Sequence, residues 1–446
     1  MTPSRLALAA VALALLTAGS KNGPPPTSID PGVRGGNAGA GSPLVGLDAT
    51  EKAFWTAARV KFINEGLTVP DGLGPRFNGI GCASCHSQPN IGGSSPAVNP
   101  QIAAATAAGA TNAIPPFISL NGPIREARFK SDGGVHDLFT IQGRTDAPGC
   151  VIAPTDFSNT SNISFRIPTP VFGVGLVELT PDVNLMNDAA AVATLRQQLG
   201  IGGKFNHKPS NDQGFNSSGN TGTIMRFGWK AQNPSLLLFS GEAYNVEMGV
   251  TNELFSVERA AACNFNPLPE DVTPFAGTSP PSASPASDFS SDIVNFAAFM
   301  RLNEPPTLVP NTPQIVQGRN AFMSAGCGAC HIPQHTTAAV AFTGQSNRTY
   351  TAYSDFQLHD MGNNLADGIV QGDASGSEFR TAPLWGVGQR IFFLHDGRTS
   401  NLVAAIEAHD PGAGNSQHSE AHQVIANFNN LSLSDQTALI VFLRGL

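Results

Sequence analysis

The sequence predicts a mainly α-helical fold with long loops, built from two related domains of which the N-terminal one is enlarged. Glycine and proline account for 81 of the 446 residues (47 plus 34), so much of the chain must be loop. Apolar residues recur at helical spacing in several segments, whereas the alternation typical of β-strands is rare and short. A Cys-x-x-Cys-His motif and a glycine-rich turn occur once in each half, which indicates an internal repeat.

The composition is that of a large globular protein that does not bind nucleic acid. The chain has 25 lysines and arginines against 33 aspartates and glutamates, a net charge of −8. A nucleic-acid-binding protein would normally carry a basic surplus. A hydrophobic content of 41% is enough for a core, and six cysteines in 446 residues exclude a small disulfide-stapled scaffold.

The first 20 residues are typical of a secretory signal peptide. Arg5 precedes an apolar run over residues 6–16, which is too short to span a bilayer. Ser20 stands where a lipoprotein would need a cysteine, so we expect a soluble, periplasmic product without a transmembrane span. Residues 21–43 are rich in proline, glycine and serine and are predicted to form a flexible tether.

The enlarged N-terminal domain is predicted over residues 44–273. Within it, residues 49–64 place three apolar side chains on one helical face, and residues 188–199 predict a second, short helix. Residues 103–110 are alanine-rich and fit either a helix or a loop.

A linker and a smaller domain follow. Residues 274–289 include the stretch PFAGTSPPSASPAS, which is typical of an inter-domain linker. The smaller C-terminal domain is predicted over residues 290–446. It is expected to open with a helix over residues 290–302 and to end with a helix over residues 432–446, whose first residues, SLSD, form a capping pattern.

The repeated cysteine motif predicts two haem groups. Its copies are Cys82-Ala83-Ser84-Cys85-His86 and Cys327-Gly328-Ala329-Cys330-His331. This spacing is the attachment signature of c-type haem, because two intervening residues present both thiols to the vinyl groups along one porphyrin edge. The adjacent histidine then lies under the ring and binds the iron. We therefore expect two covalently bound haem c groups, with His86 and His331 as iron ligands.

Other interpretations of the motif fit less well. A redox-active C-x-x-C would require a βαβ context, which the sequence lacks. A zinc site could combine the two cysteine pairs, but 245 residues separate them (327 minus 82) and each pair has an additional histidine. A single Cys-x-x-Cys-His motif could occur by chance in a chain of this length, but two copies are poorly explained by chance.

Each motif belongs to a longer repeat. Phe77 and Phe322 each precede their motif by five residues. Downstream, Pro170–Gly175 and Pro383–Gly388 share the pattern P-x-[aromatic]-G-V-G. Two related haem domains, with insertions in the first, are the simplest explanation, and the alternative is a coincidence of glycine-rich turns.

The sequence resembles the bacterial di-haem oxidoreductase family, within the wider group of di-haem cytochrome c peroxidases. The resemblance is carried by DGLGPRFNGIGCASCH, RFGWKAQNPSLLLFSGEAYNVEMGVT, YSDFQLHDMGNNLAD and FRTAPLWGVGQRIFFLHDGRTSNLVAAIEAH. It implies two cytochrome c-like domains, a reactive N-terminal haem and a C-terminal haem that relays electrons. It also implies a small periplasmic donor, such as a cytochrome c or a copper protein, and H2O2 or O2 as the electron acceptor.

The resemblance suggests a second iron ligand for the C-terminal haem. His409, which ends the segment NLVAAIEAH, matches the position of the distal ligand in relatives. His359 and Met361 in LHDMG are the alternative. We interpret His359 as a neighbour of the site, and His395 in LHDGR as a structural or propionate-bonding histidine.

The N-terminal haem is expected to face an acid–base group. Glu247 in NVEMG matches the distal glutamate of di-haem peroxidases, which can move protons during O–O cleavage. The alternative is a surface glutamate on a loop. Phe239 stands near the position where peroxidases place a glutamine, and this departure makes the pocket more apolar and favours O2 chemistry or an apolar substrate.

Trp229 in RFGWKA matches a tryptophan that lies between the two haems of relatives. An indole there would shorten the path of an electron, although an ordinary core tryptophan is the alternative. Arg226 and Arg380 are candidates for neutralising haem propionates, which need partners when buried. A surface role is the alternative for each arginine.

The sequence also raises the questions whether the two remaining cysteines form a disulfide and whether the protein binds calcium. Cys150 and Cys263 both lie in the predicted N-terminal domain of an exported chain, so a disulfide is expected, with two separate thiols as the alternative. Some relatives hold calcium between their domains. Asp355, Asp360 and Asp367 are too spread out in the sequence to mark such a site, so calcium is only allowed by the resemblance.

These observations predict an exported di-haem oxidoreductase in which Glu247 and Trp229 serve catalysis. Two rival functions stay open: an oxygenase of the rubber-cleaving type acting on an apolar substrate, and a non-catalytic electron-transfer or iron-handling cytochrome.

Overall fold

The computed structural model describes residues 28–63, 72–145, 147, 149–207, 223–260, 263, 269–273, 290–410 and 419–446. The predicted signal peptide, the first residues of the predicted tether and the predicted linker over residues 274–289 lie outside these ranges. Within them, no helix is both long enough and apolar enough to cross a membrane. In the part of the chain that the structure describes, helix is the commonest regular structure, and the short strands form four small sheets.

The N-terminal half contains short strands and several helices. Its elements are α1 (Ala49–Ile63), β1 (Arg76–Phe77), α2 (Cys82–Cys85), α3 (Gln101–Ala108), β2 (Glu126–Phe129), β3 (Val135–His136), β4 (Phe139–Thr140), the 3-10 helix η2 (Thr160–Asn162), β5 (Ile163–Arg166), α4 (Val174–Glu178), α5 (Asp182–Ala191), α6 (Ala193–Leu199) and α7 (Leu236–Met248). Strand β1 pairs with β4, and β2 lies between β3 and β5; all these pairs are antiparallel.

The remaining elements follow the predicted linker. They are α8 (Asp292–Arg301), α9 (Pro313–Ala325), the 3-10 helix η5 (Cys327–Ala329), β6 (Gln334–Thr336), β7 (Thr349–Thr351), β8 (Leu358–Asp360), α10 (Gly362–Leu365), β9 (Glu378–Arg380), the 3-10 helix η6 (Val387–Gln389), α11 (Leu402–Glu407), α12 (His422–Asn430) and α13 (Leu433–Arg444). Strand β6 pairs with β7 and β8 with β9, both antiparallel.

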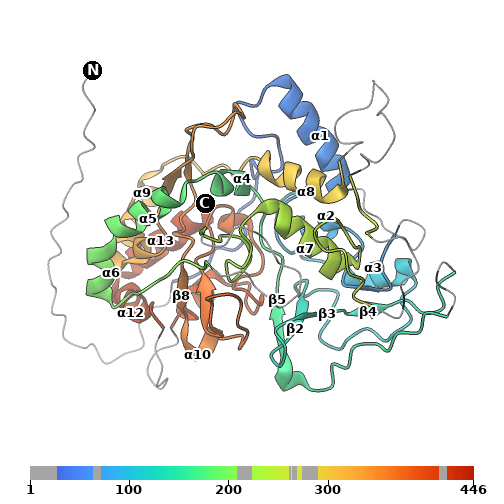
Figure 1. Cartoon of the computed structure of the whole chain (residues 1–446). Helices are drawn as coiled ribbons and strands as arrows, with labels where there is room; N and C mark the ends of the chain where they lie inside the picture. Colours follow the sequence, from blue (N-terminus) through green and yellow to red (C-terminus); the bar gives the residue numbers. More distant parts are fainter. Residues whose placement is uncertain are drawn as a thin grey trace.

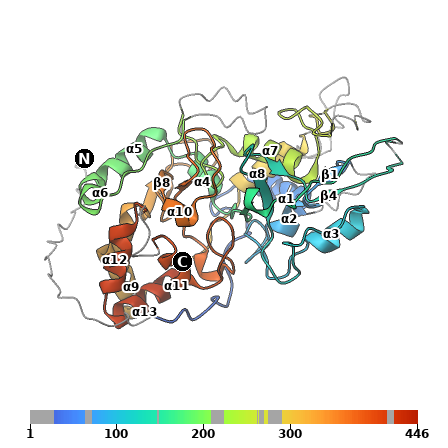
Figure 2. The same cartoon turned by 90° about the horizontal axis from the view of Figure 1, so that it is seen from below.

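The two halves of the molecule lie side by side, as Figures 1 and 2 show. Helix α8, which we predicted to open the C-terminal domain, packs against α1 and α7 of the N-terminal half. The reason is hydrophobic: Phe296 and Phe299 share one buried cluster with Trp55 and Phe62 of α1.

Helices α5 and α6 extend in the other direction, over the C-terminal half (Figures 1 and 2). Leu195 and Leu199 pack against Val424 of α12 and the second cysteine motif. The buried guanidinium of Arg196 donates to the carbonyl of Ala329 at 2.8 Å. Each half therefore contributes helices to the other, which fixes their relative position.

The glycine-rich turn recurs in space as well as in sequence. Gly173 and Gly386 open the short helices α4 and η6 with positive φ angles of 62° and 74°. Two residues on, the backbone of Gly175 lies so close to α8 that a Cβ would come within 2.1 Å of the carbonyl oxygen of Arg301. At Gly388 the same distance is 2.0 Å, to the carbonyl of Arg444 in α13. Helix α8 is therefore the counterpart of α13.

The aromatic part of the predicted repeat is wrong. Phe77 lies in β1 and packs against Phe139. The structural counterpart of Phe322 is Phe62: each side chain lies on the helix before a motif, with its ring centroid 6.2 Å and 6.4 Å, respectively, from the ring of the motif histidine. A longer connection between helix and motif in the first half hides this correspondence in the sequence.

Residues 28–43, predicted as part of a flexible tether, are hydrogen-bonded to the C-terminal half. The carboxylate of Asp30 pairs with Arg444 at 2.6 Å and accepts the amide of Leu402 at 2.6 Å. The amide of Arg34 donates to the carbonyl of Gly388 at 2.8 Å. The segment thus runs along the C-terminal half before α1 begins.

Candidate haem sites

The first motif folds as a single helical turn, α2, that ends at its histidine. The amide of His86 donates to the carbonyl of Cys82 at 2.9 Å, which places both thiols and the imidazole around one turn. The Nδ1 of His86 donates to the carbonyl of Gly93 at 3.0 Å, which orients the imidazole ring. Burial lowers the pKa of His86, which favours the neutral imidazole that binds metals.

The second motif repeats this arrangement. The amide of His331 donates to the carbonyl of Cys327 at 2.9 Å, and its Nδ1 donates to the carbonyl of Tyr353 at 2.9 Å. Burial, followed by smaller contributions that include His409, lowers the pKa of His331 to about 4. Two separate motifs with the same backbone and imidazole geometry are what two equivalent attachment sites require.

Each motif lines its own large cavity. The N-terminal cavity encloses about 1180 Å³ between protein atoms and the C-terminal cavity about 1410 Å³, open solvent at their mouths included. The cysteine pairs line different cavities, so they cannot combine into one zinc site. A mostly apolar cavity that offers two thiols and one oriented imidazole fits a c-type haem. Cys82, Cys85 and His86 would hold one haem, and Cys327, Cys330 and His331 the other.

His409 lines the C-terminal cavity together with His331. Its Nδ1 donates to the carbonyl of Ala405, one turn earlier, at 2.8 Å, which leaves Nε2 without a partner among the described residues. Burial lowers the pKa of His409. The side chain therefore has the orientation and the neutral form that a distal ligand needs. Met361 also lines this cavity and stays the alternative.

His359 is fully engaged by carboxylates. Its Nδ1 lies 2.6 Å from Glu420 and its Nε2 2.9 Å from Asp355. Burial opposes the charged form of His359, but Asp355 and the other partners raise its pKa well above the ordinary value. An imidazolium with both nitrogens bound cannot ligate iron, which agrees with our interpretation of His359 as a neighbour of the site.

One further group of metal-ligating atoms lies beside the second motif. Among the described residues, Cys330, Asp355 and His359 offer ligand atoms within 4.8 Å of one another. Asp355 already pairs with the buried guanidinium of Arg196, and Cys330 belongs to the haem motif. This group is therefore better explained as a hydrogen-bonded border of the haem cavity than as a separate metal centre.

The N-terminal cavity carries carboxyl groups where the C-terminal one carries imidazoles. Glu247 lines it from the last turn of α7, which Ser235 caps at its start and Gly249, with φ +70°, ends. The amides of Asn78 and Gly79 donate to the carbonyl of Glu247 at 2.7 and 3.2 Å and fix its backbone. Burial and then the negative charge of Glu126 raise the pKa of Glu247 well above its ordinary value.

Phe239 also lines this cavity, from the start of α7. The sequence placed it near the position of a polar glutamine in peroxidases, and in the structure its ring does form part of the wall. Met248 and Met300, the methionines of this wall, belong to the buried hydrophobic cluster of the N-terminal half. They are most simply packing residues.

Trp229 borders both cavities. Its side chain is only 8% exposed and lines the N-terminal and the C-terminal cavity as well as a small pocket between them. The indole Nε1 donates to the carbonyl of Ile167 at 2.9 Å, which fixes the ring plane. The structure thus places Trp229 at the boundary where the sequence resemblance puts it.

The two arginines that we predicted as propionate partners differ in whether their guanidinium groups already pair with a carboxylate of the protein. Arg226 is used by the protein itself, because its guanidinium pairs with Asp182 and donates to the carbonyls of Val177 and Thr180 at 3.0 and 2.6 Å. Arg380 lines the C-terminal cavity, and its Nε donates to the carbonyl of Gly228 at 2.8 Å. Burial lowers its pKa to about 10, and no carboxylate among the described residues pairs with it.

Arg390 is a functional candidate that sequence reasoning missed. It is buried, it lines the same cavity as Arg380, and its Nε has no hydrogen-bond partner among the described residues. Burial lowers its pKa to about 10. Two buried guanidinium groups without carboxylate partners fit the propionates of a haem. His395, which stacks on Phe379 with ring centroids 4.3 Å apart, lines this cavity as well.

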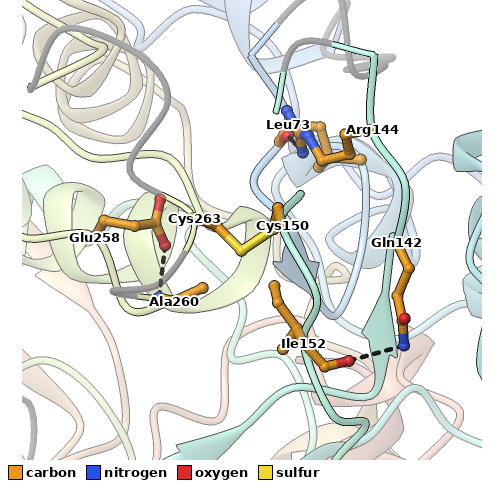
Figure 3. The surroundings of a disulfide bond; sticks show 8 residues. All are labelled: Leu73, Gln142, Arg144, Cys150, Ile152, Glu258, Ala260 and Cys263. Carbon is orange, nitrogen blue, oxygen red and sulfur yellow. Dashed lines mark hydrogen bonds between the residues drawn. A yellow bond between two sulfur atoms is a disulfide. The ribbon is translucent and has the colours of Figure 1, made fainter. Parts of the chain in front are cut away.

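The predicted disulfide is confirmed. Cys150 and Cys263 are bonded across 113 positions of the chain, as Figure 3 shows. The bond packs with Ala147, Ile152 and Ala260 in a small buried cluster. The other four cysteines are free thiols and all belong to the two motifs.

The aspartates considered for calcium are bound to other groups. Asp367 pairs with Arg166 and Lys230 at 2.8 and 3.0 Å, and Asp355 pairs with Arg196 and His359. Asp360 accepts the amide of Gly362 at 2.9 Å. These contacts leave Asp355 and Asp367 neutralised, so they offer little charge for a calcium ion.

Comparison with known proteins agrees with this pair of sites, which places the chain among proteins that handle electrons at two haem groups. Residues 145–446 match the family described as "Di-haem oxidoreductase, putative peroxidase", and the chain belongs to this family. The predicted family is therefore confirmed, and the protein is an oxidoreductase enzyme.

Two matches among solved structures have low sequence identity and TM-scores below 0.5. A MauG-like protein associated with microbial copper homeostasis shares 16% identity, with a TM-score of 0.26, over 37% of this chain and 54% of that chain. The diheme peroxidase BthA from Burkholderia thailandensis E264 shares 15% identity, with a TM-score of 0.32, over 95% of each chain. The alignment thus spans about half the length of the first protein. Comparison with curated proteins gives no match.

Proposed function

We propose that this protein is an exported, periplasmic di-haem c-type oxidoreductase that reduces peroxide or activates O2 at its N-terminal site. Electrons from a small periplasmic donor, such as a cytochrome c or a copper protein, enter at the C-terminal site and are used at the N-terminal site. A haem with both axial positions filled transfers electrons, whereas one with an open position binds and reduces oxygen species.

The observation that carries the proposal is the difference between the two cavities. His409 faces the C-terminal cavity with a free Nε2, which supports a site closed on both sides of the iron. Among the described residues, His86 is the one histidine that lines the N-terminal cavity, and Glu247 and Glu126 line it as well. Carboxyl groups of this kind can exchange protons with a bound peroxide.

The groups between the cavities support electron transfer. Trp229 is held by one hydrogen bond and touches both cavities, so its indole provides an aromatic path. Arg380 and Arg390 would pair with propionates beside it and so orient a haem toward the indole. A calcium ion, which the resemblance allows, has no support from the described aspartates.

A second function is favoured by Phe239. Its ring replaces a polar group in the wall of the N-terminal cavity and makes that wall more apolar. An oxygenase of the rubber-cleaving type, acting on an apolar substrate, would use such a wall. The third possibility, a non-catalytic cytochrome, would need a protein ligand on both faces of each haem iron.

Reaction of the purified periplasmic protein with H2O2 tests the proposal. Intact mass should first show two haem groups on the chain, through Cys82/Cys85 and Cys327/Cys330. Stopped-flow spectra should then show one haem reacting with H2O2 and the other following by electron transfer. Formation of an O2 complex without a reaction toward H2O2 would favour the oxygenase, and inertness toward both would leave an electron carrier.

A further inference from the structure

The N-terminal cavity contains a second carboxyl group that the proposed reaction has not yet used. Glu126, the first residue of β2, lines the cavity, and its side chain lies within hydrogen-bonding reach of that of Glu247 of α7. The two residues are 121 positions apart (247 minus 126) and are brought together only by the fold. Two carboxyl groups can share a hydrogen bond only if one of them carries a proton, because a carboxylate has none to donate.

The charges around the pair decide which group carries the proton. The guanidinium of Arg128, which is buried, forms an ion pair with Glu126. Burial alone would raise the pKa of Glu126, but the positive charges of Arg128 and Arg166 outweigh it and lower the pKa. For Glu247, burial and the charge of Glu126 act in the same direction and raise the pKa. The proton therefore resides on Glu247.

Other charged and titratable groups face the pair from several elements. Arg125 precedes β2, Arg166 ends β5, Cys85 and His86 end the motif turn, and Glu242 lies one turn before Glu247 on α7. Arg166 is itself held by Asp367, which also binds Lys230. Arg259 pairs with Asp137 and donates to the carbonyl of Val246. Among these, Glu126 is the anion that hydrogen-bonds Glu247.

We propose that Glu126 and Glu247 form a carboxyl pair that holds one proton, in which Glu126 is a positioning residue that keeps Glu247 in its acid form. This inference rests on the proposed function and deepens it. When hydrogen peroxide reacts, Glu247 gives up its proton and takes another from the oxygen that stays behind, while Glu126 stays ionised. The proton of Glu247 goes to the other oxygen, which leaves as water.

The charge and the atoms balance over this cycle. The pair starts and ends with a charge of −1, because one proton enters and one leaves. The remaining oxygen becomes a second water after it receives two electrons from the periplasmic donor and two protons from solvent.

An infrared pH titration of the haem-loaded protein tests the pair without measuring turnover. The carbonyl stretch of a protonated carboxylic acid identifies Glu247 by its loss in Glu247→Gln. In Glu126→Gln the neighbouring negative charge is gone, so the pH midpoint at which this band disappears should fall by about 1 unit or more. Glu126→Asp, which keeps the charge, should restore the wild-type midpoint.

A second variant and a control complete the test. Arg128→Gln removes a cation from the pair and should move the midpoint upward, so the proposal stays testable if Glu126→Gln does not fold. Glu258→Gln is the matched control, since Glu258 is a buried glutamate with a raised pKa that lies outside the cavity, near the disulfide. It should leave the midpoint unchanged.

The outcomes separate the pair from the proposed function. An unchanged midpoint in Glu126→Gln would overturn the pair, even if Glu247→Gln still slows the reaction with H2O2. A shifted midpoint together with full peroxide reactivity of Glu247→Gln would establish the pair but contradict the proposed acid–base role.

Discussion

The two halves of the molecule use one framework and differ in what faces the motif histidine. In both, a helix precedes the motif, a carbonyl holds the histidine Nδ1, and a glycine-rich turn lies against the last helix of the half. The C-terminal cavity then presents His409, and the N-terminal cavity presents Glu247. The framework thus sets where a haem binds, whereas a few side chains on the opposite wall set what it can do.

The largest effect is expected for His409→Ala. If His409 is the distal ligand, its removal opens the C-terminal iron and converts that haem completely from low spin to high spin. Absorption and electron paramagnetic resonance spectra measure this. His136→Ala is the control, because His136 lies on β3 and lines neither cavity. An unchanged spectrum would transfer the ligand role to Met361.

Glu247→Gln is expected to slow the reaction with H2O2 by about 10²-fold or more, the typical contribution of a general acid–base group. The glutamine keeps the size of the side chain but cannot exchange a proton. Rapid-mixing kinetics under half-reduced conditions provide the measurement. A rate equal to that of Glu258→Gln would show that the N-terminal cavity works without this carboxyl group.

Removal of the disulfide should lower the stability of the protein without changing either haem site. Cys150→Ser with Cys263→Ser frees a loop of 113 residues and is expected to lower the free energy of unfolding by about 2–4 kcal/mol. Thermal unfolding followed by circular dichroism tests this. The spectra of both haem groups should stay as in the wild type, because Cys150 and Cys263 line neither cavity, and a changed haem spectrum would contradict this expectation.

The smallest effects test the structural repeat. Gly175→Ala and Gly388→Ala each introduce a methyl group against a helix carbonyl, and each should cost about 1–3 kcal/mol of stability through overpacking. Gly35→Ala, in open space, should cost nothing measurable. Denaturant unfolding compares them. Equal losses of unfolding free energy would support the structural equivalence of α8 and α13. A loss at only one of the two glycines would contradict that equivalence.

The sequence predicted the local features of the sites well. The motifs, the helix over residues 49–64 and the capped last helix depend on neighbouring residues, and the structure shows α1, α13 and a Ser432 side chain that accepts the amide of Asp435. Helix α7 lacks a periodic apolar face because it is buried on most sides, and nothing in the sequence distinguished it as a helix.

The long-range features could not be predicted. Glu126 meets Glu247, and Arg390 joins Arg380, only because distant segments pack together. The packing of α8 could not be predicted for the same reason, since its apolar face meets α1, which lies more than 200 residues earlier in the chain. Phe62 was overlooked as the counterpart of Phe322 because the spacing to the motif differs between the halves.

A redox titration of the purified protein, with spectra recorded at each potential, tests the inequality of the two sites most directly. Two separate transitions are expected: a low-spin haem with two axial ligands that titrates on its own, and a second haem that binds H2O2, O2 or CO once the first is reduced. Two indistinguishable low-spin haems that bind none of these ligands at any potential would contradict the claim that the two haem sites differ.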